Sequence, residues 1–255
     1  MSTRLIIKPY FTDRAVSIFC GDCRDLLRAL PSDSVDMVLT DPPYGVGYRG
    51  RWGADSPAIA GDEGPTIMLP AFTEIWRLLK PDSLCLSFYG WPHADEFLRT
   101  WKRIGFRPVS HIVCIKNNIG LGYFSRSQHE TAFLLAKGNP RRPEPAMSDV
   151  FAWEREPCVF HPSQKPLQVI SRLLSTFTDE GDLVLDPFMG SGTTLVAARS
   201  LGRRAIGIEI EERYCEIAAQ RLAQQVLDFR PAAAPAIDEP ATLFPREEPS
   251  TGSTT

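Results

Sequence analysis

A carboxylate, two prolines and an aromatic ring follow one another at Asp41-Pro42-Pro43-Tyr44, directly after the mostly apolar residues 35–40. Successive prolines lack the N–H groups that a sheet ladder needs, so they end the preceding strand abruptly. The Asp41 carboxylate and the Pro42 carbonyl could together accept both hydrogens of a flat amino group, while Tyr44 stacks on its ring. A plain turn is the alternative, because Asp and Pro are ordinary turn residues.

The exocyclic amino group of adenine or cytosine suits such a grip. Its nitrogen is a poor nucleophile because its lone pair is delocalised into the ring, and two acceptors would localise that pair. They would also stabilise the positive charge that develops as the nitrogen attacks an electrophile. A base held in this way must first be swung out of the duplex. We therefore expect Asp41, Pro42 and Tyr44 to form a catalytic site for an extruded base.

A second motif, at residues 183–194, reads as a buried strand, a glycine turn and the start of a helix. Gly190 and Gly192 let the backbone approach a ligand closely. Glu209 ends the next predicted strand, 23 positions after Asp186, a spacing that suits a carboxylate binding ribose hydroxyls. A dinucleotide is the competing ligand, but its pattern wants a small residue where Leu195 stands. Asp186 would repel a pyrophosphate and suits an ammonium group, such as that of S-adenosylmethionine.

Together the two motifs resemble those of the amino-group DNA methyltransferases, which act on adenine N6 or cytosine N4. The catalytic motif comes first, as in the circularly permuted order of the group called beta, and the resemblance runs from about residue 18 to 227. It implies that Ser163 and Lys165 lie near the carboxylate of the cofactor's methionine, and that Asp22 accepts from the cofactor's adenine. The cofactor-binding residues that we predict are Asp22, Cys23, Ser163, Lys165, Asp186, Phe188, Gly190, Ser191, Gly192, Thr193 and Glu209.

The resemblance implies an S-adenosylmethionine-dependent enzyme that methylates double-stranded DNA, and the six scattered cysteines favour a cytoplasmic location. Aspartate in the first position of the catalytic motif is commoner among the adenine enzymes, and serine among those acting on cytosine N4, so Asp41 favours adenine N6. Cytosine N4 and a catalytically inactive DNA-binding relative are the alternatives. RNA or a protein glutamine as substrate, and a nucleotide-dependent oxidoreductase, are more remote. A homodimer and a cognate restriction endonuclease are partners that the resemblance leaves open.

Positive charge is concentrated in one part of a chain whose net charge is −3. Residues 99–142 hold nine Lys or Arg residues and a single acid, Glu130. A concentrated basic stretch is the footprint expected of phosphate contact, although a solvated surface is the alternative. We predict that this stretch faces DNA. The DNA contacts that we predict are Arg126, Arg141, Arg142 and Trp52.

Alternating strand and helix patterns predict an α/β fold with a doubly wound, mostly parallel, Rossmann-like sheet. Seven strands are expected, at residues 16–19, 35–39, 84–88, 111–115, 131–135, 183–185 and 205–208. Helices are expected near residues 23–30, 66–79, 93–104, 164–177, 193–201 and 211–227. Ligands bind at the carboxyl ends of the strands in such sheets. Asp41 and Asp186 both follow strand ends, so they would share one crevice if the two strands are neighbours.

The expected domain spans residues 1–229, and a disordered tail follows at 230–255. Residues 45–65 read as a mobile loop over the site, because loops of this length are usually functional or disordered. Residues 137–157 read as irregular chain, and 137–160 as a short target-recognition segment. The four histidines show no ligand spacing, so no metal is expected, and no run of 18 apolar residues suggests a membrane span.

Overall fold

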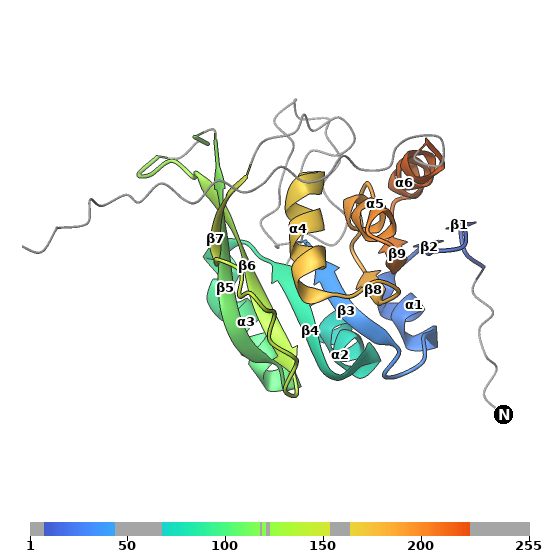
Figure 1. The fold of residues 1–255 in the computed structure, drawn as a ribbon, viewed down its shortest axis with the longest axis horizontal. Helices are drawn as coiled ribbons and strands as arrows, with labels where there is room; N and C mark the ends of the chain where they lie inside the picture. The colour runs from blue at the N-terminus through green and yellow to red at the C-terminus, as the bar shows by residue number, and fades with distance from the viewer. Residues whose placement is uncertain (1–7, 44–67, 118, 121–122, 154–163, 225–255) are drawn as a thin grey trace, which may run out of the picture.

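One mixed sheet of nine strands organises the molecule, in the order β1-β2-β9-β8-β3-β4-β6-β5-β7 (Figure 1). The computed structural model describes residues 8–43, 68–117, 119–120, 123–153 and 164–224. The strands are β1 (Phe11–Thr12), β2 (Val16–Cys20), β3 (Val35–Thr40), β4 (Leu79–Phe88), β5 (Arg107–Lys116), β6 (His129–Lys137), β7 (Val150–Trp153), β8 (Leu183–Asp186) and β9 (Arg204–Glu209).

All seven expected strands are present, and two short edge strands are added to them. β1 has two residues and β7 has four, so neither is long enough to show the alternation that reveals a strand in sequence. β7 also corrects the expectation that residues 137–157 are wholly irregular. It pairs in parallel with β5, from Val113↔Val150 to Lys116↔Trp153, and its neighbours along the chain include several prolines.

Strand direction decides which residues meet at the edge where ligands would bind. β2, β9, β8, β3 and β4 run parallel to one another, so their carboxyl ends share one edge of the sheet. β6 runs antiparallel to both β4 and β5. The first residues of β6 therefore lie at that same edge, and the last ones lie at the opposite end.

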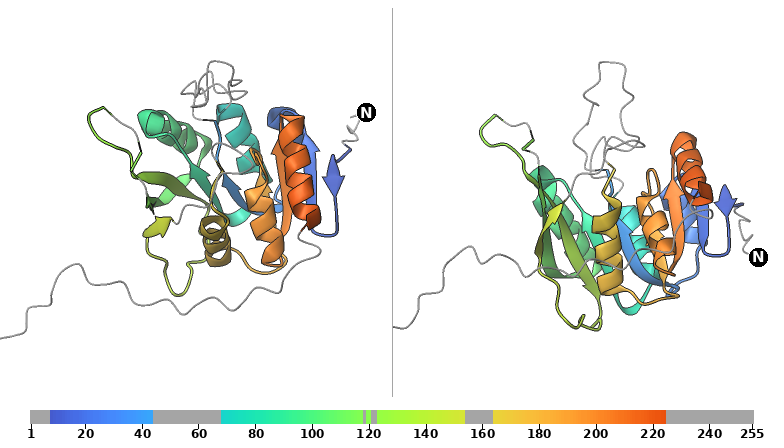
Figure 2. Two further views of the ribbon diagram at one scale, coloured as in Figure 1. Left: turned by 90° about the horizontal axis from the view of Figure 1, so that it is seen from above. Right: turned by 45° about the horizontal axis from the view of Figure 1, so that its top comes forward.

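Three helices cover each face, as a doubly wound sheet requires (Figure 2). One face carries α1 (Cys23–Ala29), α2 (Met68–Leu78) and α3 (Ala94–Ile104), the last preceded by the 3₁₀ turn η2 (Trp91–His93). The other face carries α4 (Leu167–Phe177), α5 (Thr193–Ser200) and α6 (Glu212–Gln224). Each predicted helix is thus present, with ends that differ from the expectation by a few residues.

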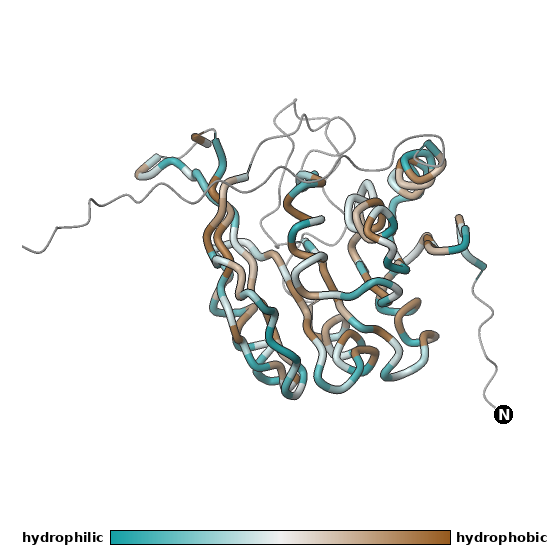
Figure 3. The backbone as a smooth tube through the Cα atoms, viewed as in Figure 1, coloured by the Kyte–Doolittle hydropathy of each residue, from teal (hydrophilic) through white to brown (hydrophobic). Residues whose placement is uncertain are grey.

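The central strands are buried on both faces, which is why they read as almost continuous apolar runs. Along β3, Met37 and Leu39 belong to the core under α4, α5 and α6, whereas Val38 belongs to the core under α1, α2 and α3. Figure 3 shows this hydrophobic character along the middle of the sheet, with polar residues gathered in the connections. A rigid double-sided core therefore holds the strand ends that carry the motifs.

Candidate active site

The two motif carboxylates lie at the ends of neighbouring strands. β3 pairs in parallel with β8, with Met37 opposite Val184 and Val38 opposite Leu185. Thr40, the last residue of β3, donates its hydroxyl hydrogen to Asp186 Oδ1 over 2.9 Å, and Asp41 follows directly. The two strands are thus neighbours, which is the condition for Asp41 and Asp186 to share one crevice.

Asp186 is a buried carboxylate that, among the described residues, accepts hydrogen bonds from neutral groups rather than from a cation. Burial raises its pKa to about 7, although hydrogen bonds from the Thr194 and Thr40 side chains and from the Phe188 N–H oppose the shift. The nearby Asp41 carboxylate raises the pKa further. An ammonium group beside Asp186 would supply the missing positive charge, so the site suits the amino group of a methionine-type ligand.

The glycine turn after β8 needs glycine at Gly190 and Gly192, whose φ angles are 50° and 78°. A Cβ on Gly192 would also lie 2.7 Å from the Ala218 Cβ of α6. Gly192 itself caps α5, with no side-chain capping bond. The Thr194 hydroxyl hydrogen-bonds to Asp186 instead of capping the helix, and Thr193 Oγ1 accepts from Arg221 at 3.2 Å.

Glu209, at the end of β9, ties the glycine turn to the neighbouring strand. Its Oε2 accepts from Gly190 N at 3.0 Å and its Oε1 accepts from Glu211 N at 2.9 Å, while burial raises its pKa. On the other side, Gly21 N donates to the Glu209 carbonyl over 2.8 Å. The residues that we predicted to hold the ribose and the cofactor's adenine therefore come together at one edge.

Asp22 begins α1 as its N-cap and accepts from Arg24 N at 2.8 Å. Its carboxylate also pairs with the Arg24 guanidinium at 2.5 Å, and these bonds lower its pKa. Cys23, the first residue of the helix, is buried. The adenine contact of Asp22 stays a prediction, in which the carboxylate would serve both a helix and a ligand.

Lys165 is buried and links the catalytic motif to a second carboxylate. Its Nζ hydrogen-bonds to Asp41 Oδ2 and lies 3.2 Å from Glu130 Oε2. The ammonium also sits 4.8 Å from the ring centroid of Phe88. The structure thus brings this lysine to Asp41. Its contact with the cofactor's carboxylate stays a prediction.

Sequence reasoning missed Thr40, Thr194 and Glu130 as parts of this site. Glu130 did carry a signal, because it is the only acid among residues 99–142. The two threonines carried none, since strand ends and helix starts commonly contain threonine. Tyr44, Ser163 and Trp52 lie outside the described residues, as do the expected loop at 45–65 and the tail at 230–255.

The basic stretch at residues 99–142 is divided between two ends of the sheet. Arg126 is exposed in the connection between β5 and β6, near the fully exposed rings of Tyr123 and Phe124, at the end that holds Asp41. Arg107 and Lys137 lie at the other end, where they bond to Gly138 O and to Asp33. The stretch is therefore not one continuous DNA-facing surface.

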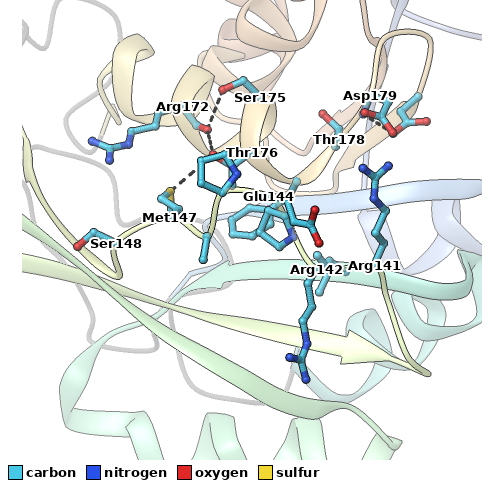
Figure 4. A pocket seen from close by; sticks show the side chains of 16 residues that line it. Arg141, Arg142, Glu144, Met147, Ser148, Arg172, Ser175, Thr176, Thr178 and Asp179 are labelled. Carbon is cyan, nitrogen blue, oxygen red and sulfur yellow. Dashed lines mark hydrogen bonds between the residues drawn. The ribbon is translucent and has the colours of Figure 1, made fainter. Parts of the chain in front are cut away.

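Arg141 and Arg142 follow β6 and lie at the end of the sheet away from Asp41. They line a pocket of about 630 Å³ beside the carboxyl end of α4, where Figure 4 shows Arg141 near Asp179 and Arg142 directed away. The pocket also includes Glu144, Arg172 and Asp182. The structure thus brings Arg126, but not Arg141 and Arg142, to the edge that carries the catalytic motif.

Within the part of the chain that the structure describes, no group of three or more His, Cys, Asp or Glu side chains is placed to hold a metal ion. Among those same residues, no helix combines the length and the hydrophobicity that crossing a bilayer requires.

An α/β sheet that unites an acidic-proline motif with a glycine turn defines a class of methyltransferase, and sequence comparison agrees. Residues 35–220 match the family described as DNA methylase, N6_N4_Mtase. The chain belongs to this family of DNA methyltransferases acting on amino groups, whose cofactor is S-adenosylmethionine.

Individual relatives cover most of the chain. YubD of Escherichia coli (strain K12), whose name calls it a methylase, is 43% identical over 203 residues, which are 80% of this chain and 88% of YubD. The type II methyltransferase M2.DpnII of Streptococcus pneumoniae is 28% identical over 252 residues, or 86% of this chain and 93% of that protein.

Solved structures share the fold. The M1.HpyAVI–SAM complex superposes with a TM-score of 0.64 at 25% identity, over 81% of this chain and 99% of that one. The cytosine-N4-specific PvuII DNA methyltransferase reaches a TM-score of 0.72 over 85% of this chain and 89% of its own, at 19% identity. The mixed, mostly parallel sheet flanked by helices is therefore the architecture of this enzyme class.

Proposed function

We propose that this chain transfers a methyl group from S-adenosylmethionine to N6 of an adenine extruded from double-stranded DNA. The observation that carries the proposal is the pairing of β3 with β8, which puts Asp41 and Asp186 at adjacent strand ends. A base amino group held at Asp41 and a cofactor ammonium held at Asp186 would then lie in one crevice.

The catalytic residues act mainly by positioning. Asp41 and the Pro42 carbonyl accept the two amino hydrogens, and Tyr44 stacks on the base. The bound cofactor supplies an electrophilic methyl group. Holding the amino nitrogen in line with it can contribute ~7–11 kcal/mol to lowering the barrier. The methylated nitrogen then loses its extra proton to water, so no separate general base is required.

The cofactor's parts are assigned to the remaining residues. Asp186 accepts from the ammonium group, Glu209 from the ribose hydroxyls and Asp22 from the adenine. Ser163 and Lys165 are assigned to the methionine carboxylate. The remaining predicted residues are assigned to the walls of the cofactor site: Cys23, Phe188, Gly190, Ser191, Gly192 and Thr193.

The preference for adenine rests on the residue type at Asp41, because the resemblance associates aspartate there with adenine enzymes. Cytosine N4 is the rival within the same family, and the fold shared with the PvuII enzyme is compatible with it. Arg126, which is exposed at the catalytic edge, is the first candidate for DNA contact, together with Trp52. A restriction endonuclease and a second copy of the chain remain candidate partners.

Methyl transfer and the identity of the product test the proposal together. The purified full-length chain would be incubated with unmethylated genomic DNA and S-adenosylmethionine bearing a labelled methyl group, and the digested nucleosides analysed by mass spectrometry. We expect N6-methyldeoxyadenosine, and none from Asp41→Ala, which should still bind the cofactor in calorimetry. N4-methyldeoxycytidine would overturn the adenine assignment, and full activity in Asp41→Ala would overturn the mechanism.

A further inference from the structure

Four side chains of alternating charge form a continuous row that runs from β5 and β6 to the catalytic motif. Lys116 Nζ on β5 lies 2.6 Å from Glu130 Oε1 on β6, and Glu130 Oε2 lies 3.2 Å from Lys165 Nζ. Lys165 in turn bonds to Asp41 Oδ2. Each of the two inner groups, Glu130 and Lys165, thus touches an opposite charge on either side.

Glu130 is held in place by the backbone of a strand. It is the second residue of β6, a strand with antiparallel neighbours on both sides, and it lies opposite Cys114 of β5. Its carboxylate is shared by two ammonium groups, which lower its pKa despite the opposing effect of burial. Glu130 is therefore a charged carboxylate at a defined place in the sheet.

Lys165, by contrast, is a long side chain that precedes α4 and is only 9% exposed. A buried ammonium group is costly unless carboxylates surround it. Glu130 on one side and Asp41 on the other, with the Phe88 ring beneath, supply that environment. Without Glu130, the ammonium would lose one of its two charged partners and could adopt other positions.

We infer that Glu130 is a positioning residue for methyl transfer, which acts through Lys165 to orient the Asp41 carboxylate. The inference rests on the proposed function, in which Asp41 grips the amino group of the base. Asp41 lies one residue beyond β3, past the last residue of the strand. Small displacements of such a group are costly, because a misplacement of about 1 Å can lower a rate by about 100-fold.

Glu130→Gln tests the inference, since glutamine keeps the shape and removes the charge. We expect kcat to fall between about ten- and a hundred-fold, with the KM for DNA changed by less than about three-fold. Lys165→Met should lower kcat at least as much, and Lys165→Arg should recover part of that loss.

The double variant separates positioning from an independent effect. If Glu130 acts through Lys165, adding Glu130→Gln to Lys165→Met should lower kcat no further. Lys80→Met is the matched control, because Lys80 also pairs with an aspartate of β3, Asp36 at 2.5 Å, but at the far end of the strand. It should leave kcat unchanged.

A crystal structure of full-length Glu130→Gln supplies a readout that does not depend on activity. We expect the Lys165 ammonium and the Asp41 carboxylate to have moved together from their wild-type positions. Wild-type positions of both groups, an unchanged kcat, or additive losses in the double variant would each overturn the inference. If Glu130→Gln unfolds at a lower temperature than the wild type, kcat is measured for Glu130→Asp instead. Its shorter side chain cannot span both lysines, so kcat should fall in this variant as well.

These outcomes are distinct from failure of the proposed function. That function fails if the wild-type chain transfers no methyl group to DNA or if Asp41→Ala stays active. With an active wild type and an inactive Asp41→Ala, a normal Glu130→Gln enzyme contradicts the positioning role alone.

Discussion

The hydroxyl of Thr40 donates a 2.9 Å hydrogen bond to the carboxylate of Asp186, although the two residues lie 146 positions apart. The bond joins the strand that leads to the catalytic motif with the strand that leads to the glycine turn. It also favours the ionised form of Asp186, because a donor stabilises a carboxylate. The Thr40 side chain therefore fixes the position of the catalytic motif relative to the glycine turn, and it also influences the charge of Asp186.

Thr40→Val should weaken cofactor binding. Valine has nearly the shape of threonine but no hydroxyl group, so Asp186 loses a hydrogen bond worth about 0.5–1.5 kcal/mol. We expect the Kd for S-adenosylmethionine in calorimetry to rise by about two- to ten-fold. Thr12→Val, which removes an exposed hydroxyl that bonds to Ser17, is the control and should bind normally. Normal binding by Thr40→Val would show that the bond does not support the pocket.

Cofactor affinity should depend on pH through Asp186. The pKa of this carboxylate is raised to about 7, and only its ionised form attracts an ammonium group. Affinity should therefore fall as pH falls below 7, by about ten-fold for each unit at low pH. Asp186→Asn should bind weakly at every pH between 5 and 7. A wild-type Kd that is flat over this range would contradict the assignment.

The same raised pKa has the opposite consequence for the stability of the ligand-free protein. Because the folded state holds the proton more tightly than the unfolded state, the stabilising contribution is complete below about pH 4, where both states are protonated, and it is lost as pH rises to 7. Relative to Asp186→Asn, the wild type should lose on the order of 4 kcal/mol of unfolding free energy across this interval. Urea unfolding of both proteins at pH 4.5 and 7.5 measures this difference, which saturating cofactor should reduce.

Gly192→Ala should destabilise the turn between β8 and α5 and impair cofactor binding. Its φ of 78° disfavours any side chain, and the new Cβ would lie 2.7 Å from Ala218. Gly181→Ala is a matched control, because Gly181 has a similar φ of 87° but nothing within 4 Å of its added Cβ. Gly181→Ala should cost about 1 kcal/mol or somewhat more, from backbone strain alone. The larger loss expected for Gly192→Ala, measured by urea unfolding, reports the clash with α6, and equal losses would exclude it.

Arg126 and Arg141 should differ in their effect on DNA binding. Arg126 is exposed at the catalytic edge, whereas Arg141 lines the pocket at the other end of the sheet. We expect Arg126→Gln to weaken DNA binding and to reduce the slope of log K against log salt concentration by about one. Arg141→Gln should do neither. Fluorescence anisotropy over a range of salt concentrations gives both values. The reverse pattern would place DNA across the opposite end.

Much of the fold could be predicted because its strands are buried on both faces and its helices have one apolar side. β3, β8 and β9 show this clearly, but their order in the sheet is known only from the structure. β1 and β7 could not be predicted, because strands this short are stabilised by pairing with a neighbour rather than by their own pattern.

The site divides in the same way. Asp41, Asp186 and Glu209 were found because each stands at a strand end in a motif. The partners of Lys165 could not be found, because Glu130 reaches it only through the reversed direction of β6. The placement of Arg141 away from the catalytic edge could not be predicted either, since a charge count along the chain does not reveal which end of a strand a residue follows, and its DNA contact stays a prediction.

The insertion of β4 to β7 between β3 and β8 in the chain has an evolutionary consequence. β2, β9 and β8 lie on one side of β3 and carry the motifs predicted to bind the cofactor, whereas β4, β6, β5 and β7 lie on the other side. Changes in the length or surface of the connection between β5 and β6 need not disturb β2, β9 and β8. We expect related enzymes to diversify their DNA preferences there while the chemistry is inherited unchanged.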